Sequence, residues 1–344
     1  MNKTNMEAIA QKAGLSKNTV SVALRGMPGI SPETRARILA IAQEMGYSYK
    51  KKAVEKRPRS QNLCIIVPTI AHDRQGFFAH IQLGIEQEAR KNHFNMIFHS
   101  YEDDGRRFEM PLCVQEGLVS GIISVGRISE ATAAAIRKTG LPFVMADHFL
   151  ESAPGDCVLT DNIQGGDTAT EYLIRMGHRD IGFFGDINAA TSYCDRYIGF
   201  RRAMARHGLT VNESHCMTQK GLDEQLRSDH DISVEVMNKL GGLPTAFFCV
   251  NDAAAISLYR TLSELNLALP QDVSVMGFDD TEASELVSPA LSTMHVHKEL
   301  LGRRAFLRLL SCIREPQRVS EKLLLSADLV VRNSVRDLTG TRPE

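Results

Sequence analysis

Residues 6–24, MEAIAQKAGLSKNTVSVAL, contain two short helical patterns separated by a Gly-Leu turn. The first pattern ends at Gly14 and puts its apolar residues on one helical face: Met6, Ile9, Ala10 and Ala13. In the second, Ser16 can cap a helix over residues 17–24 with its inward positions at Val20, Ala23 and Leu24. Two short helices joined by such a turn predict a helix-turn-helix.

A third helix follows the loop over residues 26–30. Ser31 is suited to cap it, Pro32 favours the first helical position, and the apolar pattern continues to Met45 before Gly46. The three helices together predict a small helical domain at the start of the chain.

The exposed start of the second predicted helix carries polar residues. Lys17 and Asn18 are residue types that hydrogen-bond base edges in the major groove of DNA. Thr19, Ser21 and Arg25 are suited to phosphate contacts, which fix the register of a protein on DNA. A generic three-helix bundle would explain the caps and the apolar face, but not this polar face.

The charge of the chain is divided unevenly. Residues 1–60 hold twelve Lys or Arg and four Glu, a net charge of +8, whereas the remaining 284 residues carry −9. A basic end on an acidic body is typical of a protein whose end binds a polyanion. The charge therefore favours the DNA-binding interpretation over a solvated basic tail.

This N-terminal segment resembles the headpiece of the lac/galactose repressor (LacI–GalR) family. The resemblance is carried by residues 9–21 (IAQKAGLSKNTVS), 24–26 (LRG), 30–35 (ISPETR) and 45–47 (MGY). It implies that Val22 also faces DNA, although the family usually has Arg there and often has Asn where Arg25 stands.

A basic stretch over residues 48–62 follows, with Glu55 as its one acid. In the family this stretch forms a hinge helix that inserts a Leu into the minor groove, and here the register places Lys56 at that position, with Pro58 soon after. We expect a basic linker whose Lys51 and Lys56 contact DNA. A flexible tether is the open alternative.

From Leu63 onward, short apolar runs alternate with helical patterns. The predicted strands of the first half are 63–68, 95–100, 121–125 and 142–146, with helices at 79–92, 108–116 and 130–139. Those of the second half are 181–185, 215–218, 246–250 and 273–278, with helices at 166–176, 197–207, 233–240 and 252–265. This alternation predicts a doubly wound parallel α/β fold in two lobes, with a cleft at the carboxyl ends of the strands.

The body also resembles the effector domain of the same family, which has the periplasmic-binding-protein fold. The matching runs are Val158-x-x-Asp161-Asn162, residues 177–183, 196–203, 251–254, 272–280 and 289–293. The resemblance implies a headpiece at 1–47, a linker at 48–62 and a two-lobed effector-binding and dimerisation domain at 63–335. Lobe 1 is expected over about 63–158 plus 294–325, and lobe 2 over about 163–290 plus the C-terminal segment.

Five residues at strand ends or helix starts are the candidates for effector binding: Phe78, Asp147, Arg196, Asn251 and Asp279. Asp, Asn and Arg supply donors and acceptors for vicinal hydroxyls, and an aromatic ring supplies a face for a sugar or base. In the family these positions line the effector cleft. Asn251 and Asp279 have an alternative role, because Asn and Asp after a strand often cap the next helix.

The sequence offers little for other chemistry. The seven cysteines are scattered without a C-x-x-C pair, the start has no apolar signal region, and no nucleophile or phosphate-loop motif occurs. His295 and His297 are a possible metal pair, although they fit a crossover segment better. We expect a cytoplasmic protein that is not an enzyme and has no metal or other cofactor.

These features predict a sequence-specific transcriptional regulator, most simply a repressor, that binds an operator in double-stranded DNA as a homodimer and responds to a carbohydrate-like effector. Two alternatives remain. One is a sugar-binding protein, and the other is a sugar-metabolising enzyme, each fused to a DNA-binding head.

Overall fold

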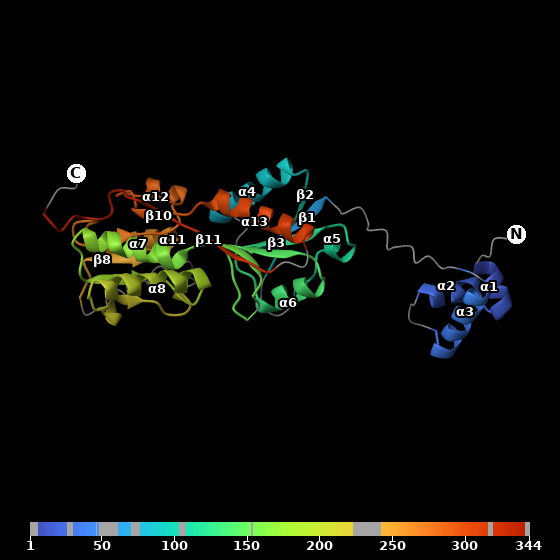
Figure 1. Ribbon diagram of the computed structural model, residues 1–344. Coiled ribbons are helices and arrows are strands. Elements are labelled where there is room, and N and C mark those ends of the chain that lie inside the picture. Colours follow the sequence, from blue (N-terminus) through green and yellow to red (C-terminus); the bar gives the residue numbers. More distant parts are fainter. Residues whose placement is uncertain are drawn as a thin grey trace. The chain divides into compact units, whose positions relative to one another are not determined.

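The computed structural model describes residues 6–25, 30–45, 47, 61–69, 76–102, 108–152, 154–222, 242–315 and 319–340. Contacts divide the chain into two units: residues 1–60, which include the headpiece, and residues 61–344, which we call the body (Figure 1). The predicted linker residues Lys51 and Lys56 lie outside the described residues, as does the predicted helix over 233–240.

The headpiece contains the three predicted helices, α1 (Met6–Ala13), α2 (Lys17–Arg25) and α3 (Pro32–Glu44). Its fully buried side chains, Ile9, Val20 and Ile38, come from one helix each. Ser31 Oγ accepts a hydrogen bond from the backbone N–H of Thr34 at 3.2 Å, which is the predicted cap of α3.

The first lobe of the body is built on a six-stranded parallel sheet in the order β11-β5-β4-β3-β1-β2. The strands are β1 (Asn62–Pro68), β2 (Asn95–Tyr101), β3 (Gly121–Val125), β4 (Phe143–Ala146), β5 (Asp156–Thr160) and β11 (Lys322–Leu325). Its helices are α4 (Phe77–Lys91), α5 (Leu112–Gln115), α6 (Glu130–Lys138) and α13 (Lys298–Arg314). Helices α4 and α13 lie side by side on one face of the sheet, and α6 covers the other (Figure 1).

Glycines allow α4 and α13 to approach each other closely. A Cβ atom on Gly84 would overlap the backbone of Glu299, and one on Gly302 would overlap the backbone of Ile81. This contact fixes the start of α13 against the start of α4, next to the cleft described below.

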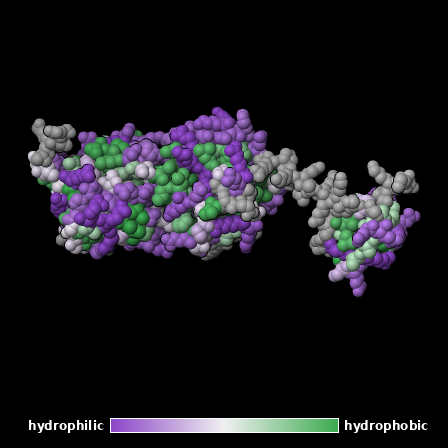
Figure 2. Space-filling view, in the orientation of Figure 1, coloured by the Kyte–Doolittle hydropathy of each residue, from purple (hydrophilic) through white to green (hydrophobic). Residues whose placement is uncertain are grey.

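The second lobe has a four-stranded parallel sheet in the order β7-β6-β8-β9. Its strands are β6 (Ile181–Phe184), β7 (Cys216–Met217), β8 (Ala246–Cys249) and β9 (Ser274–Met276). Its helices within the described residues are α7 (Asn162–Arg175), α8 (Thr191–Arg206), α11 (Asp252–Glu264) and α12 (Glu282–Leu286), and a 3-10 turn spans Glu213–His215. Figure 2 shows several hydrophobic patches among hydrophilic residues on the visible face, whereas the continuous apolar clusters lie inside the lobes.

Three segments join the two lobes within the described residues. One is Asp161, between β5 and α7, and the others are residues 296–297 and 326–327. Strands β10 (Thr293–His295) and β12 (Asp328–Val330) pair antiparallel beside the last two crossings. Because the strands of both sheets are parallel, their carboxyl ends can meet at the gap between the lobes.

The structure corrects two predicted helices. The helix expected over 108–116 is limited to α5, because Pro111 has no N–H and holds the preceding residue in an extended conformation. The helix expected over 197–207 begins at Thr191, so Arg196 lies within α8 rather than before it. The first turns of α8 are poor in strong helix formers and are held by tertiary bonds of Arg196.

Several elements have no counterpart among the predicted ones. They are the strands β5, β10, β11 and β12 and the helices α12 and α13. All of them except α12 lie at the lobe crossings or in the segment that returns to the first lobe. Their position is set by contacts between distant parts of the chain, which local patterns do not encode.

Candidate functional site

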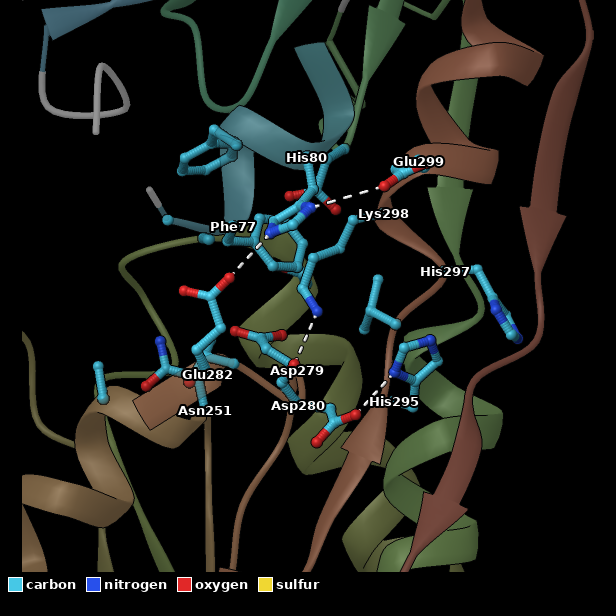
Figure 3. A pocket seen from close by; sticks show the side chains of 18 of the residues that line it. Phe77, His80, Asn251, Asp279, Asp280, Glu282, His295, His297, Lys298 and Glu299 are labelled. Atoms are coloured by element: carbon cyan, nitrogen blue, oxygen red, sulfur yellow. Dashed lines mark hydrogen bonds and ion pairs between the residues drawn. The ribbon is translucent and has the colours of Figure 1, made fainter. Parts of the chain in front are cut away.

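A cleft of about 860 Å³ lies between the two lobes. All five predicted effector-binding residues line it: Phe78, Asp147, Arg196, Asn251 and Asp279. The first two come from the first lobe and the other three from the second, and Figure 3 shows Asn251 and Asp279 facing the cleft together with residues of the α13 segment. The strand-end residues therefore meet at one place, as their positions in parallel sheets require.

Arg196 is buried at the base of the cleft and uses all three of its nitrogens. Its Nε donates to Asn162 Oδ1 at 2.9 Å, Nη1 donates to the carbonyl of Val250 at 2.7 Å, and Nη2 lies 3.0 Å from Asp279 Oδ1. The guanidinium also lies 3.7 Å from the centre of the Phe278 ring. These contacts hold the charged group in one orientation.

Three Asp residues of the cleft have backbone φ angles in a region that is rarely occupied. Asp147, Asp279 and Asp280 have φ angles of 59°, 110° and 52°, in the left-handed region that non-glycine residues rarely adopt. Asp and Asn tolerate this region better than other residues, and such strain is concentrated at functional sites. The three side chains are thus directed by the turns that follow β4 and β9.

Burial raises the pKa of Asp147 and Asp279 in the cleft and of the buried Asp252. It raises the pKa of Asp147 to about 7, although nearby Arg196 lowers it in part. Burial also raises the pKa of Asp279 and, together with the charge of Asp279, raises that of Asp252 to about 7. Asp252 is fully buried and accepts hydrogen bonds from Thr293 and Thr281. A carboxyl with a pKa near 7 is partly protonated at neutral pH, so it can accept a hydrogen bond from a hydroxyl group or donate one to it.

Asn251 has a structural role in addition to its place in the cleft. Its Oδ1 accepts from the backbone N–H of Ala254 at 2.8 Å and caps α11, as the alternative interpretation of this residue predicts. Its Nδ2 donates to the hydroxyl of Tyr193 at 2.7 Å. The Asn251 amide thereby positions Tyr193, which also lines the cleft.

Two adjacent phenylalanines form the aromatic side of the cleft. The rings of Phe77 and Phe78 meet edge to face with their centroids 5.2 Å apart. Phe78 packs against Gly126, where a Cβ atom would lie 2.8 Å from the ring and where the φ angle is +78°. Gly126 is therefore required for the position of this ring.

The candidate DNA-contacting residues lie on α2. Lys17 and Asn18 are exposed, and Thr19, Ser21 and Val22 are half-buried. Lys17 Nζ lies 3.4 Å from Glu7 Oε2 of α1, and Ser16 Oγ accepts from the backbone N–H of Thr19 at 3.1 Å. Arg25 ends the helix, and its side chain is outside the described part of the chain.

Comparison with known proteins finds a family model that matches each of the two units. Residues 5–49 match the model for bacterial regulatory proteins of the lacI family, and residues 170–335 match the model for a periplasmic binding protein-like domain. The chain belongs to the lacI family. It is a DNA-binding transcriptional regulator, and the predicted combination of a helix-turn-helix headpiece with a two-lobed α/β body is confirmed.

Relatives of this lacI-family regulator match it over nearly its whole length. It is 29% identical to the ribose operon repressor of Haemophilus influenzae over 97% of this chain and 99% of the relative. It is 28% identical to the repressor PurR of Pasteurella multocida over 95% and 97% of the two chains.

Solved structures share the fold. A LacI family regulator from Enterococcus faecium with bound ribose has a TM-score of 0.66 and 25% identity, covering 81% of this chain and 100% of that one. A lac repressor dimer bound to operator has a TM-score of 0.65 and 23% identity, covering 97% and 100%.

The cleft of this lacI-family regulator also contains residues that the sequence analysis did not name as effector-binding candidates. They are contributed by α4, α8, α12 and the segment around the start of α13: His80, Tyr193, Glu282, His295, His297, Lys298, Glu299 and Arg303. Tyr193 lies three residues before Arg196, a spacing that shares a helical face once α8 is known to begin at Thr191. No local sequence pattern indicated that the residues near the start of α13 would line the cleft.

His295 and His297, considered as a possible metal pair, contact separate carboxylates. His295 Nδ1 lies 2.7 Å from Asp280 Oδ2, and His297 Nε2 lies 2.9 Å from Asp328 Oδ2. Within the described ranges, no group of three or more His, Cys, Asp or Glu side chains is arranged to hold a metal ion. In the same residues, no helix has the length and apolar character needed to cross a bilayer.

Proposed function

We propose that this regulator represses transcription as a homodimer on a pseudo-palindromic operator and that a polyhydroxylated, carbohydrate-like effector in the cleft changes its operator affinity. The observation that carries the proposal is the cleft itself. It brings Asp147 of one lobe together with Arg196 and Asp279 of the other, beside the Phe77 and Phe78 rings. An effector that contacts both sides would favour one arrangement of the lobes over another.

The chemistry of the cleft supports a ligand with several hydroxyl groups. Asp147 and Asp279 accept hydrogen bonds from hydroxyls, Arg196 donates to them, and an aromatic ring packs on the apolar face of a sugar. The ribose operon repressor and the ribose-bound regulator among the relatives support the same class.

The headpiece supplies the proposed DNA contacts. Lys17 and Asn18 would read base edges, and Val22 would lie against the bases beside them. Phosphate contacts would come from a second set: Thr19, Ser21, Arg25, Lys51 and Lys56. Residues 48–62 would link this headpiece to the two-lobed domain over 63–335.

We further propose that the protein acts in the cytoplasm, where its operator is, and that it binds its effector without converting it. A single headpiece buries too little surface for tight specific binding, which supports a dimer and an operator with two half-sites.

The test combines DNA binding with ligand binding. Operator sequences are selected from a random DNA library with the full chain, and affinity is measured by fluorescence anisotropy with and without each member of a sugar panel. Tm is followed in parallel, and sedimentation gives the oligomeric state. A sugar that alters operator affinity and raises Tm without being consumed supports the proposal. Failure to select any DNA sequence, or turnover of a sugar, contradicts it.

A further inference from the structure

The cleft of the proposed regulator holds basic side chains that form no ion pair with a described carboxylate. They are Arg127, which follows β3, and Lys298 and Arg303, which belong to α13. Arg127 Nη1 donates to the carbonyl of Ala189 at 2.6 Å, and Lys298 Nζ donates to the carbonyl of Asp280 at 2.9 Å. Backbone carbonyls accept hydrogen bonds from Arg127 and Lys298, and the nearby carboxylates act on the Lys298 ammonium without forming a direct ion pair with it.

Lys298 is the most constrained of the three. Its side chain is 9% exposed, and its Nζ lies 5.9 Å from the centre of the Phe77 ring (Figure 3). Burial lowers its pKa even though the carboxylates of Asp279, Asp280, Asp252 and Glu282 act in the opposite direction. The surroundings therefore stabilise this ammonium less well than water does. A negatively charged group beside it would stabilise its charged form.

The carboxylates of the cleft are engaged elsewhere. Asp279 pairs with Arg196, and Asp280 pairs with Arg332 and His295. Glu282 and Glu299 both contact His80, at 3.4 and 3.8 Å. Asp147 has a pKa of about 7 and is only partly ionised near neutral pH. Among the described basic side chains of the cleft that form no ion pair, Lys298 and Arg303 lie together on α13, where a ligand would meet both.

The backbone adds positive potential at the same place. Helices α4 and α13, of 15 and 17 residues, begin at the cleft, and neither has a side-chain hydrogen bond at its N-cap. The N-terminal end of a helix carries a partial positive charge. Lys298 is the first residue of α13, and its Nζ lies 5.9 Å from the centre of the ring of Phe77, the first residue of α4.

We propose that the effector is an acidic polyol, a sugar-like molecule whose carboxylate or phosphate group pairs with Lys298 and Arg303 while its hydroxyls meet Asp147, Arg196 and Asp279. This inference rests on the proposed function and specifies its ligand class. The cleft volume of about 860 Å³ accommodates a monosaccharide with such a substituent.

The experiment uses the full chain and sets of neutral and acidic sugars. The sets are glucose, glucuronate and glucose 6-phosphate; galactose and galacturonate; and ribose and ribose 5-phosphate. Tm and titration calorimetry are measured at constant ionic strength, with acetate and inorganic phosphate alone as anion controls. We expect at least one acidic member to raise Tm and to bind about tenfold or more tightly than its neutral parent. Whether the uronates or the phosphates bind identifies the acidic group.

Variants connect that preference to the named residues. Arg303→Met and Lys298→Met should each weaken binding of the acidic member about tenfold or more and leave the weaker binding of its neutral parent unchanged. Arg304→Met is the matched control, because Arg304 is exposed and does not line the cleft. Should Lys298→Met fail to fold, the half-exposed Arg303 still provides the test.

Two results overturn the inference: a neutral parent that binds as tightly as its acidic derivatives, or a panel in which no acidic member raises Tm. A neutral sugar that changes operator affinity would refute the acidic class and leave the proposed regulator intact. Loss of all sequence-specific DNA binding would refute the proposed function whichever ligands bind.

Discussion

Arg196 Nη2 and Asp279 Oδ1 lie 3.0 Å apart at the base of the cleft, with both side chains largely removed from solvent. Arg196 belongs to α8 and Asp279 follows β9, so the pair joins two segments of the second lobe that are far apart in sequence. Removing one partner of such a pair leaves the other charge buried without compensation, which costs more than the intact pair contributes.

Asp279→Ala should therefore lower the free energy of unfolding of the body by about 3 kcal/mol. Urea denaturation followed by circular dichroism measures the change. Arg90→Ala is the comparison, because it removes an exposed ion pair with Glu86 on α4 and should change the free energy by no more than about 0.5 kcal/mol. Equal effects of the two substitutions would show that the Arg196–Asp279 pair has no special structural importance.

Asn251 combines a cap with a contact to Tyr193, and two substitutions separate these roles. Asn251→Ala removes the cap of α11 and should lower the free energy of unfolding by about 1 kcal/mol. Asn251→Asp keeps an oxygen for the Ala254 N–H and should retain the stability, but it loses the amide donor to the Tyr193 hydroxyl. Thermal unfolding measures the first effect and effector titration the second. Equal loss of stability in both variants would contradict the capping role.

The sequence was sufficient to predict the headpiece and most of the body because their determinants are local. Ser31 and Pro32 mark the start of α3, and the apolar run over 121–125 coincides with β3. The same local rules located Asp147 and Asp279, since strand-end residues of parallel sheets share an edge.

The remainder of the site depends on tertiary structure. Lys298 and Arg303 reach the cleft because α13 returns to the first lobe and packs against α4 through Gly84 and Gly302. Nothing in the periodicity of α13 specifies that partner. His80 is similarly brought to Glu282 across the two lobes.

The exposed position of Lys17 on α2 predicts that it contributes to sequence preference. Lys17→Ala should relax the preference among selected operator variants, whereas Lys51→Ala should weaken binding to all DNA about equally and lower the salt slope by about one unit. Lys12→Ala is a control, because Lys12 pairs with Glu44. Anisotropy titrations at several salt concentrations measure both effects. If Lys17→Ala changes only the salt slope, then α2 is not the element that reads the bases.

The burial of His178 predicts that the free energy of unfolding of the body decreases at acid pH. It is buried, its Nε2 donates to the Arg336 carbonyl at 3.2 Å, and burial lowers its pKa to about 4. The unfolded chain, with a histidine pKa near 6.5, binds the proton more readily than the folded chain does, so stability is present above about pH 6.5 and is lost as the pH falls toward 4.

The loss attributable to His178 should reach about 2 kcal/mol between pH 7 and pH 5. His178→Gln retains an amide donor for the Arg336 carbonyl and does not titrate, so this variant should lose less stability over the same interval. Urea denaturation at pH 7 and pH 5 compares the two proteins. Identical pH dependence in both would mean that His178 is protonated in the folded chain as readily as in the unfolded one.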